Sequence, residues 1–297
     1  MKSKSALRLC LSLFVCFALL IGADAFLPDM LTLYPEWFAL LFDAAAMMLP
    51  IVLLHLLMPK KEVFRPKLKP ANFTAERVSF TICIGLFAAC IRFFVDYLVY
   101  RIQHTDSLSL RFAILDIPFG NAVSIATLLA VIVLPAFFEG LYLRGYIQTF
   151  LSEYISTRPV LIVMSCVTAM LYGSLSQFLG ALLFSFFLSW LTFSFGSFWY
   201  SVIAQAVATA LYLFFDWLLQ EFTIYGILRT LPSCALLLAL FFLYMALRTA
   251  ERLSLRQAFK KLHYVQHSDY SLSKFAGNAA TLAFLFVFIA KALIGIV

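Results

Sequence analysis

Long apolar runs separated by short polar segments dominate the chain. Several of these runs exceed about 18 residues, the length at which an α-helix crosses the hydrocarbon core of a bilayer. They predict an all-α fold, a polytopic bundle of transmembrane helices. After an ambiguous first run, we predict spans at residues 37–58, 78–100, 121–150, 159–178, 180–195, 198–219, 231–247 and 276–297.

The first apolar run admits two interpretations. Residues 9–22 follow a basic start and precede Ala23-Asp24-Ala25, which is the layout of a cleaved secretory signal peptide. A retained first span explains the same residues, and we favour it because multi-span proteins often begin with an uncleaved anchor. The chain has nine spans if this run is retained and eight if it is removed. Either interpretation puts residue 30 outside.

The basic residues predict the orientation of the bundle. The segments 59–70 and 248–274 are the two most basic loops, and positively charged loops stay on the cytoplasmic side. Alternating spans from a cytoplasmic N-terminus put both loops inside and the C-terminus outside. Residues 253–262 combine helical apolar spacing with basic residues, which suits a helix on the inner membrane surface or an ordinary solvated helix. We predict a location in a bacterial cytoplasmic membrane.

Composition agrees with a membrane protein and excludes other classes. The chain is 64% hydrophobic and 12% charged, whereas a soluble domain is about half apolar and about a quarter charged. The net charge of +7 comes from loops that face anionic lipid, so we predict the lipid bilayer, and no nucleic acid, as a partner. None of the six cysteines forms a C-x-x-C pair, and no G-x-x-x-x-G-K loop occurs.

Two charged residues inside one predicted span are candidates for function, because burying a charge in a membrane is costly. Glu139 and Arg144 both fall in the apolar run that continues to Phe150. Pro135 is expected to kink this run, since a helical proline loses a backbone hydrogen bond and clashes with the preceding turn. The depth of Glu139 in the membrane depends on that kink.

Other charged residues in the spans have structural explanations. Arg92 and Asp96 are four residues apart, so we predict an ion pair on one helix face, with a structural role rather than a role in a relay. Asp43 and His55 lie toward the ends of their span and are expected at the membrane interfaces. Small residues in spans let helices approach closely, and we expect this of Gly140, Gly173, Gly180 and Gly196.

The stretch Glu139-Gly140-x-x-x-Arg144-Gly145-Tyr146 resembles the first motif of the CAAX-protease and bacteriocin-processing (CPBP) family, E-E-x-x-x-R followed by glycine and an aromatic residue. The second family motif, F-x-x-x-H, falls on Tyr172 to Ser176. The third, H-x-x-x-N, falls on Gln205 to Thr209. The resemblance covers residues 120–215 and implies a CPBP-like helical core. It divides the chain into four regions. They are an anchor or first helix (1–25), an N-terminal transmembrane region (26–118), the core (119–220) and a C-terminal transmembrane region (221–297).

The departures from the motifs bear on activity. The resemblance implies two carboxylates and two histidines that bind a metal or activate a water to attack a peptide bond. In this chain Glu139 is the remaining member of that set, and the other motif positions hold Gly140, Ser176, Gln205 and Thr209. No histidine occurs between residues 139 and 209, and catalytic zinc takes histidine and carboxylate ligands. We therefore expect no metal and no cofactor.

The lost second carboxylate changes the expected local electrostatics. In an α-helix, Glu139 and Arg144 are about 140° apart and do not face each other. We predict a neutral hydrogen-bonding pocket around Glu139, formed by Ser176, Gln205 and Thr209, with Arg144 and Tyr172 in the same polar set. In an alternative interpretation, Glu139 and Arg144 mark the inner membrane face, where an arginine snorkels to the interface.

Three functions remain open. The first is a pseudoprotease that binds another membrane protein or a lipidated peptide without hydrolysis. The second is a working intramembrane endopeptidase in which Glu139 acts as a general base. The third is a transporter or channel component, with Glu139 and Arg144 lining a polar path.

Overall fold

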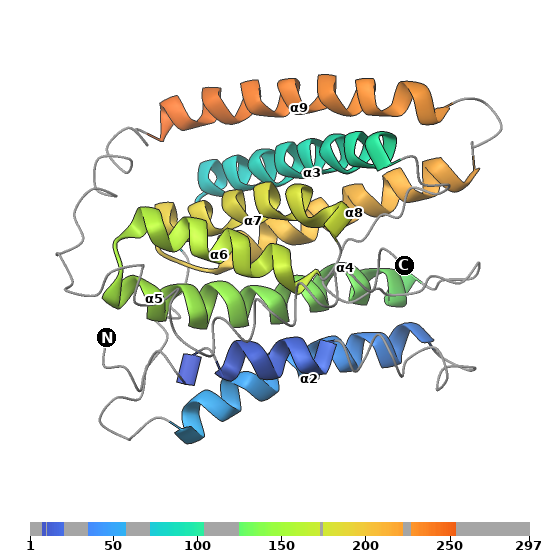
Figure 1. Ribbon diagram of the computed structural model, residues 1–297. Helices are drawn as coiled ribbons and strands as arrows, with labels where there is room; N and C mark the ends of the chain where they lie inside the picture. The colour runs from blue at the N-terminus through green and yellow to red at the C-terminus, as the bar shows by residue number, and fades with distance from the viewer. Residues whose placement is uncertain are drawn as a thin grey trace. The chain divides into compact units, whose positions relative to one another are not determined.

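The computed structural model describes residues 8–9, 11–20, 35–57, 72–103, 125–172, 175–221 and 227–253 of the 297. Within these ranges the protein is entirely helical, as the sequence predicts (Figure 1). A helix at Leu11–Leu20 comes first. The others are α2 (Pro35–Leu57), α3 (Ala75–Gln103), α4 (Ile125–Glu139), η2 (Gly140–Gln148), α5 (Thr149–Tyr154), α6 (Thr157–Leu171), α7 (Leu175–Phe195), α8 (Trp199–Glu221) and α9 (Ile227–Arg252).

The described helices confirm that this is an integral membrane protein with several spans. Six are long and apolar enough to cross a bilayer, and α4, η2 and α5 together count as one of these. Leu11–Leu20 and Thr157–Leu171 are shorter apolar helices. Each helix overlaps a predicted span, because apolar runs of this length leave little choice of element. The span predicted at 159–178 was too long, since α6 ends at Leu171 and α7 begins at Leu175.

Some predictions fall outside the described residues. They are the A-x-A sequence (23–25), the basic loop (59–70), the surface helix beyond its first residue (254–262) and the last span (276–297). The side chain of Ser176 also lies outside them, although its backbone belongs to α7. The kink expected at Pro135 stays a prediction, since α4 is helical through that residue.

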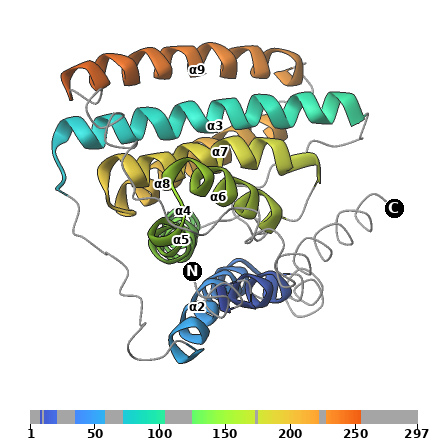
Figure 2. The ribbon, with the colours of Figure 1, turned by 60° about the vertical axis from the view of Figure 1, so that its left-hand side comes forward.

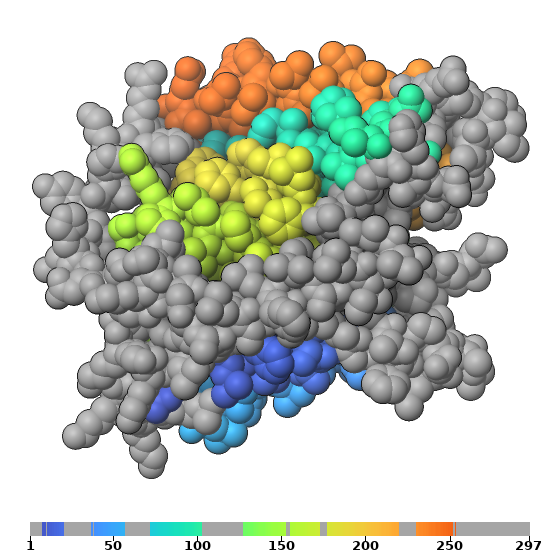
Figure 3. Space-filling model, in the orientation of Figure 1, coloured from blue at the N-terminus to red at the C-terminus, as the bar shows by residue number. Residues whose placement is uncertain are grey.

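The chain divides into two compact units. Unit 1 comprises residues 1–68, 113–163 and 265–297, and unit 2 comprises residues 69–112 and 164–264. In unit 2, α3 packs against α7, α8 and α9 (Figures 1 and 2). Figure 3 shows the side chains of α9 lying along those of α3.

The core of unit 2 is rich in aromatic and small residues. Phe93 of α3 packs against Phe215 of α8, with ring centroids 4.6 Å apart. Gly85 allows α8 to approach α3 closely, since a Cβ atom at this position would lie 2.6 Å from the carbonyl oxygen of Ala204. Small residues serve this purpose in membrane bundles, where apolar burial against lipid gives helices little reason to associate.

In unit 1, α2 packs against α4 and η2. The helix Leu11–Leu20 joins them through two buried side-chain contacts. The hydroxyl groups of Ser12 and Tyr142 are 2.9 Å apart, and Cys16 Sγ lies 4.0 Å from Met47 Sδ of α2. These contacts join the helix Leu11–Leu20 both to α2 and to η2, the segment that follows Glu139.

The helix that carries the first motif changes its winding immediately after Glu139. Residues 140–148 form a π-helix, η2, before α-helical geometry returns at Thr149. Where the winding changes, the carbonyl oxygen of Arg144 accepts a hydrogen bond from Thr149 Oγ1 at 3.2 Å. Gly140 and Gly145 make this segment a poor α-helix former. Such π-helical segments are rare and often occur at functional sites.

Candidate functional site

Glu139 is the last residue of α4, and Arg144 is the central residue of η2. Each side chain is 1% exposed, so neither projects from the surface as a snorkelling residue does. The expected separation of 140° was wrong because it assumed an α-helix. Hydrogen bonds in a π-helix join residues five apart, so these two residues are about one turn apart. The π-helix thus places the two positions closer to one helix face than α-helical spacing implies.

Asp43 is a second buried acid in the same unit. The sequence placed it at the membrane interface; its side chain is 1% exposed and so faces the interior of the protein, while its depth in the membrane stays a prediction. Its helix, α2, packs against α4, which ends at Glu139. Both carboxyl oxygens of Asp43 are buried without a hydrogen-bond partner. His55, on the same helix, is exposed and packs edge-on against Tyr146.

In unit 2, the predicted pair of Arg92 and Asp96 is confirmed. Arg92 Nε lies 3.6 Å from Asp96 Oδ2, and both side chains are buried. Arg92 also donates a hydrogen bond to the Tyr172 hydroxyl at 3.2 Å. The Tyr212 hydroxyl donates to Asp96 Oδ2 at 2.9 Å. The pair is therefore held by hydroxyl groups from the end of α6 and from α8.

Aromatic rings surround the Arg92 guanidinium group. Its central carbon lies 4.5 Å from the ring centroid of Tyr172, 4.9 Å from that of Tyr212 and 5.4 Å from that of Phe184. Rings at these distances stabilise a cation through their electron-rich faces. The charge of Arg92 is thus stabilised both by the Asp96 carboxylate and by the surrounding aromatic rings.

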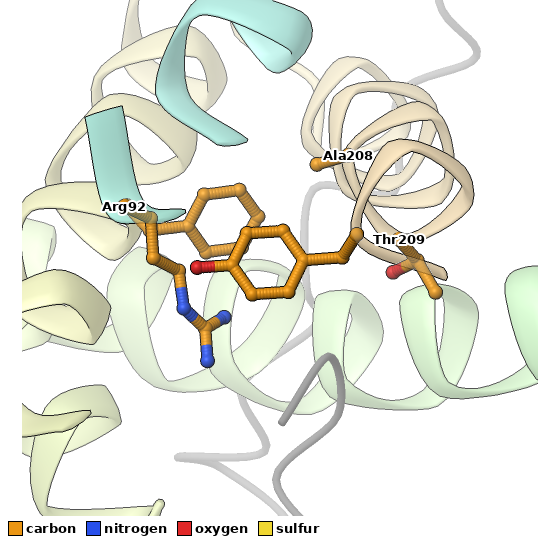
Figure 4. A pocket seen from close by; sticks show the side chains of 5 residues that line it. Arg92, Ala208 and Thr209 are labelled. Atoms are coloured by element: carbon orange, nitrogen blue, oxygen red, sulfur yellow. The ribbon is translucent and has the colours of Figure 1, made fainter. Parts of the chain in front are cut away.

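The third motif faces this buried arginine. Thr209 and Arg92 line one pocket together with Phe184, Ala208 and Tyr212, and no water-sized sphere fits into it. Figure 4 shows Arg92 extending from α3 opposite Ala208 and Thr209 of α8. Gln205, one helical turn before Thr209, is also buried.

Comparison with known families adds one finding. Residues 121–211 match the family model described as type II CAAX prenyl endopeptidase Rce1-like. The match makes this segment similar to that family, and the segment is called the Rce1-like domain below. No curated protein and no solved structure matches the chain.

The Rce1-like domain contains all of the predicted site residues but not all of the buried charges. The site residues within it are Glu139, Arg144, Tyr172, Ser176, Gln205 and Thr209. The structure brings Tyr172 and Thr209 together at Arg92. Glu139 and Arg144 belong to unit 1, and Tyr172, Gln205 and Thr209 to unit 2, so the neutral pocket around Glu139 stays a prediction.

The residues at the motif positions of the Rce1-like domain do not fit a catalytic metal. Within the described ranges, no three His, Cys, Asp or Glu side chains converge as metal ligands do. Gln205 and Thr209 offer neutral oxygen and nitrogen atoms, which are poor zinc ligands. Thr209 also lines one pocket with Arg92, and a buried cation in this unit opposes the binding of a second one.

Two residues outside the Rce1-like domain were missed as parts of a site. Asp43 was assigned to an interface and Arg92 only to a pair with Asp96. The signal for both was present, since any charged residue inside a span is a functional candidate. Their long-range partners were not visible in the sequence, because those partners come from other helices.

Proposed function

We propose that this protein is a non-hydrolytic relative of the type II CAAX prenyl endopeptidases. It lies in a bacterial cytoplasmic membrane with its N-terminus inside and binds a membrane partner without cleaving it. The observation that carries the proposal is the set of residues at the motif positions. Gly140, Ser176, Gln205 and Thr209 stand where the family has glutamate, two histidines and asparagine.

The surroundings of the motif residues support loss of hydrolysis. The Tyr172 hydroxyl accepts a hydrogen bond from the buried Arg92 guanidinium group, and Thr209 lines a pocket with the same residue. A guanidinium remains charged at any physiological pH and cannot accept a proton from water. Arg92 therefore cannot replace a histidine as a general base.

The partner is another membrane protein or a lipidated peptide. Both kinds of ligand meet apolar helix faces inside the bilayer, and α9 exposes several large apolar side chains, namely Leu237, Leu240, Phe241 and Leu247. Lipid covers such a face when no partner is bound. Fold alone does not select between the two partners, because function depends on the site.

Binding to a prenylated peptide and to native membrane proteins tests this proposal. The purified protein in nanodiscs is titrated with a fluorescent prenylated peptide, and cross-linked partners from native membranes are identified by mass spectrometry. We expect saturable binding to one of the two. The Glu139→Gln variant should bind as tightly as the wild type, because Glu139 has no catalytic step to perform. An unprenylated peptide is the control.

Two results contradict the proposal. The first is the absence of both saturable peptide binding and a reproducible cross-linked partner. The second is conversion of the bound peptide to a shorter product by the wild type but not by Glu139→Gln.

One observation favours a second candidate function. Asp43 supplies a second buried carboxyl group on α2, which packs against the helix that ends at Glu139, although α2 lies outside the Rce1-like domain. Two carboxyl groups in one site suit general acid–base chemistry on a water molecule. An active peptidase would use Glu139 as base and Asp43 as acid, so both Glu139→Gln and Asp43→Asn would abolish cleavage.

A further inference from the structure

We propose that the helix Leu11–Leu20 is retained in the mature protein as the permanent partner of a surface made by α2 and η2. A cleaved signal peptide, the other interpretation of this apolar run, would leave that surface bare. A retained helix does not depend on the proposed function, because a partner-binding protein and a peptidase can both contain it.

The helix Leu11–Leu20 has one buried face and one exposed face. Leu11 and Phe14 are 41% and 36% exposed. The buried side chains are spaced so that they form one stripe, and they are Ser12, Leu13, Cys16, Phe17 and Leu20. A stripe with this spacing is the face that a helix packs against its neighbours. The segment therefore has the pattern of a bundle helix, with a second face that lipid can cover.

Two contacts set the register between this helix and α2. Ser12 Oγ donates a hydrogen bond to the carbonyl oxygen of Pro50 at 3.5 Å. Cys16 Sγ lies 4.0 Å from Met47 Sδ. Four residues forward on the first helix thus correspond to three residues backward on α2. The two helices therefore run in opposite directions, as consecutive helices of a bundle do.

Ser12 also joins the first helix to the first motif. Its hydroxyl group lies 2.9 Å from that of Tyr142, which follows Glu139 by three residues in η2. Because Ser12 donates its proton to Pro50, Tyr142 is the donor of this second bond. Both side chains are 0% exposed, and Ser12 is the one hydrogen-bond partner of the Tyr142 hydroxyl among the described residues. One hydroxyl group thus ties three helical segments together.

Cleavage after Ala25 would remove all of these contacts. A buried hydroxyl group without a partner is costly, and Tyr142 would be left with one. A signal peptide needs only an apolar run, because it leaves the mature protein. A polar side chain that bonds across helices is instead typical of spans that stay together in a membrane. The retained helix closes the Tyr142 side of η2 to any other partner.

Intact mass spectrometry tests whether the helix is retained. The full chain, with a tag added at its C-terminus, is produced in a bacterial host that has signal peptidase and is purified from the membrane. We expect the mass of all 297 residues plus the tag. A mass that begins at Phe26, the residue after the A-x-A sequence, overturns the proposal.

Oxidative cross-linking tests the register with α2. Met47→Cys is made in a variant whose cysteines other than Cys16 are replaced by serine, and copper phenanthroline is the oxidant. We expect a disulfide between positions 16 and 47, identified by mass spectrometry after digestion. Met48→Cys is the matched control and should form none, because Met48 is 37% exposed and lies on another face of α2. Equal cross-linking of both variants, or none with Met47→Cys, overturns the proposal.

A double-mutant cycle tests the bond between Ser12 and Tyr142 without added cysteines. Ser12→Ala and Tyr142→Phe should each lower the Tm. The double variant should lower it no further than Ser12→Ala does, because both changes remove the same hydrogen bond. Ser233→Ala, at an exposed serine of α9, is the control and should keep the wild-type Tm. Losses that add in the double variant would show that the two hydroxyl groups do not meet, and this also overturns the proposal.

Discussion

Replacing Arg92 with methionine is expected to lower the free energy of unfolding by about 3–5 kcal/mol. Methionine keeps the length and apolar surface of the side chain but removes its charge. Asp96 would then remain buried without a counter-charge, and the Tyr172 hydroxyl would lose its donor at 3.2 Å. Unfolding in mixed micelles of increasing SDS content, followed by circular dichroism, measures the change.

A double variant separates the cost of an unpaired charge from the value of the pair. Arg92→Met combined with Asp96→Leu removes both charges, and replacing a whole buried ion pair by apolar residues is often close to neutral. We expect it to recover most of the lost stability. Tyr172→Phe should lose about 1.5–3 kcal/mol, the range for a hydrogen bond to a charged group. A double variant as unstable as Arg92→Met would contradict this explanation.

Replacing Gly85 with alanine is expected to destabilise unit 2 by about 3 kcal/mol, the upper end of the range for overpacking. The added Cβ atom would lie 2.6 Å from the carbonyl oxygen of Ala204 and 2.9 Å from its Cα atom. Both are backbone atoms, so no side-chain rotation relieves the contact and α3 must move from α8. The better helix propensity of alanine offsets only about 1 kcal/mol.

The matched control for Gly85→Ala adds atoms at an exposed position. Ala210 is an exposed residue of α8, and Ala210→Val should change the free energy of unfolding by at most about 0.5 kcal/mol. The same SDS titration serves for both variants. Gly85→Ala with wild-type stability would show that α3 and α8 do not pack as closely as described.

The helices of this protein are predictable from sequence because a membrane leaves few alternatives. Apolar runs of spanning length gave α2, α3, α7, α8 and α9 to within a few residues. The pairing of Arg92 with Asp96 also followed from their spacing of four. Both inferences depend only on the residues within a single helix and on their spacing.

Properties that depend on other helices were harder to predict. Because α2 is apolar on every side, periodicity does not show which face turns inward, and the burial of Asp43 was therefore missed. The π-helix after Glu139 changes the angular spacing on which the first expectation rested. The aromatic cage around Arg92 joins α3 to α7, α8 and the end of α6, contacts that spacing along one helix cannot reveal.

The glycines show the same limit. Gly180 was expected to allow close approach, and a Cβ atom there would clash with the Asp96 carboxylate, so this expectation is confirmed. Gly196 was expected to do the same, but a Cβ atom there would have no neighbour within 4 Å, and its φ is +68°. It is needed for the turn between α7 and α8, where a left-handed backbone favours glycine. Gly173 lies outside the described residues, and the close approach at Gly85 was not anticipated.

Incubation with a prenylated peptide that has a CAAX terminus shows whether the protein has lost hydrolysis. The purified protein in nanodiscs is mixed with the peptide, with and without added zinc, and products are identified by mass spectrometry. We expect intact peptide in both conditions, because Gly140, Ser176, Gln205 and Thr209 replace the second glutamate, the two histidines and the asparagine of the family motifs. A shortened peptide formed by the wild type, and not by Glu139→Gln, would contradict the proposed loss of activity.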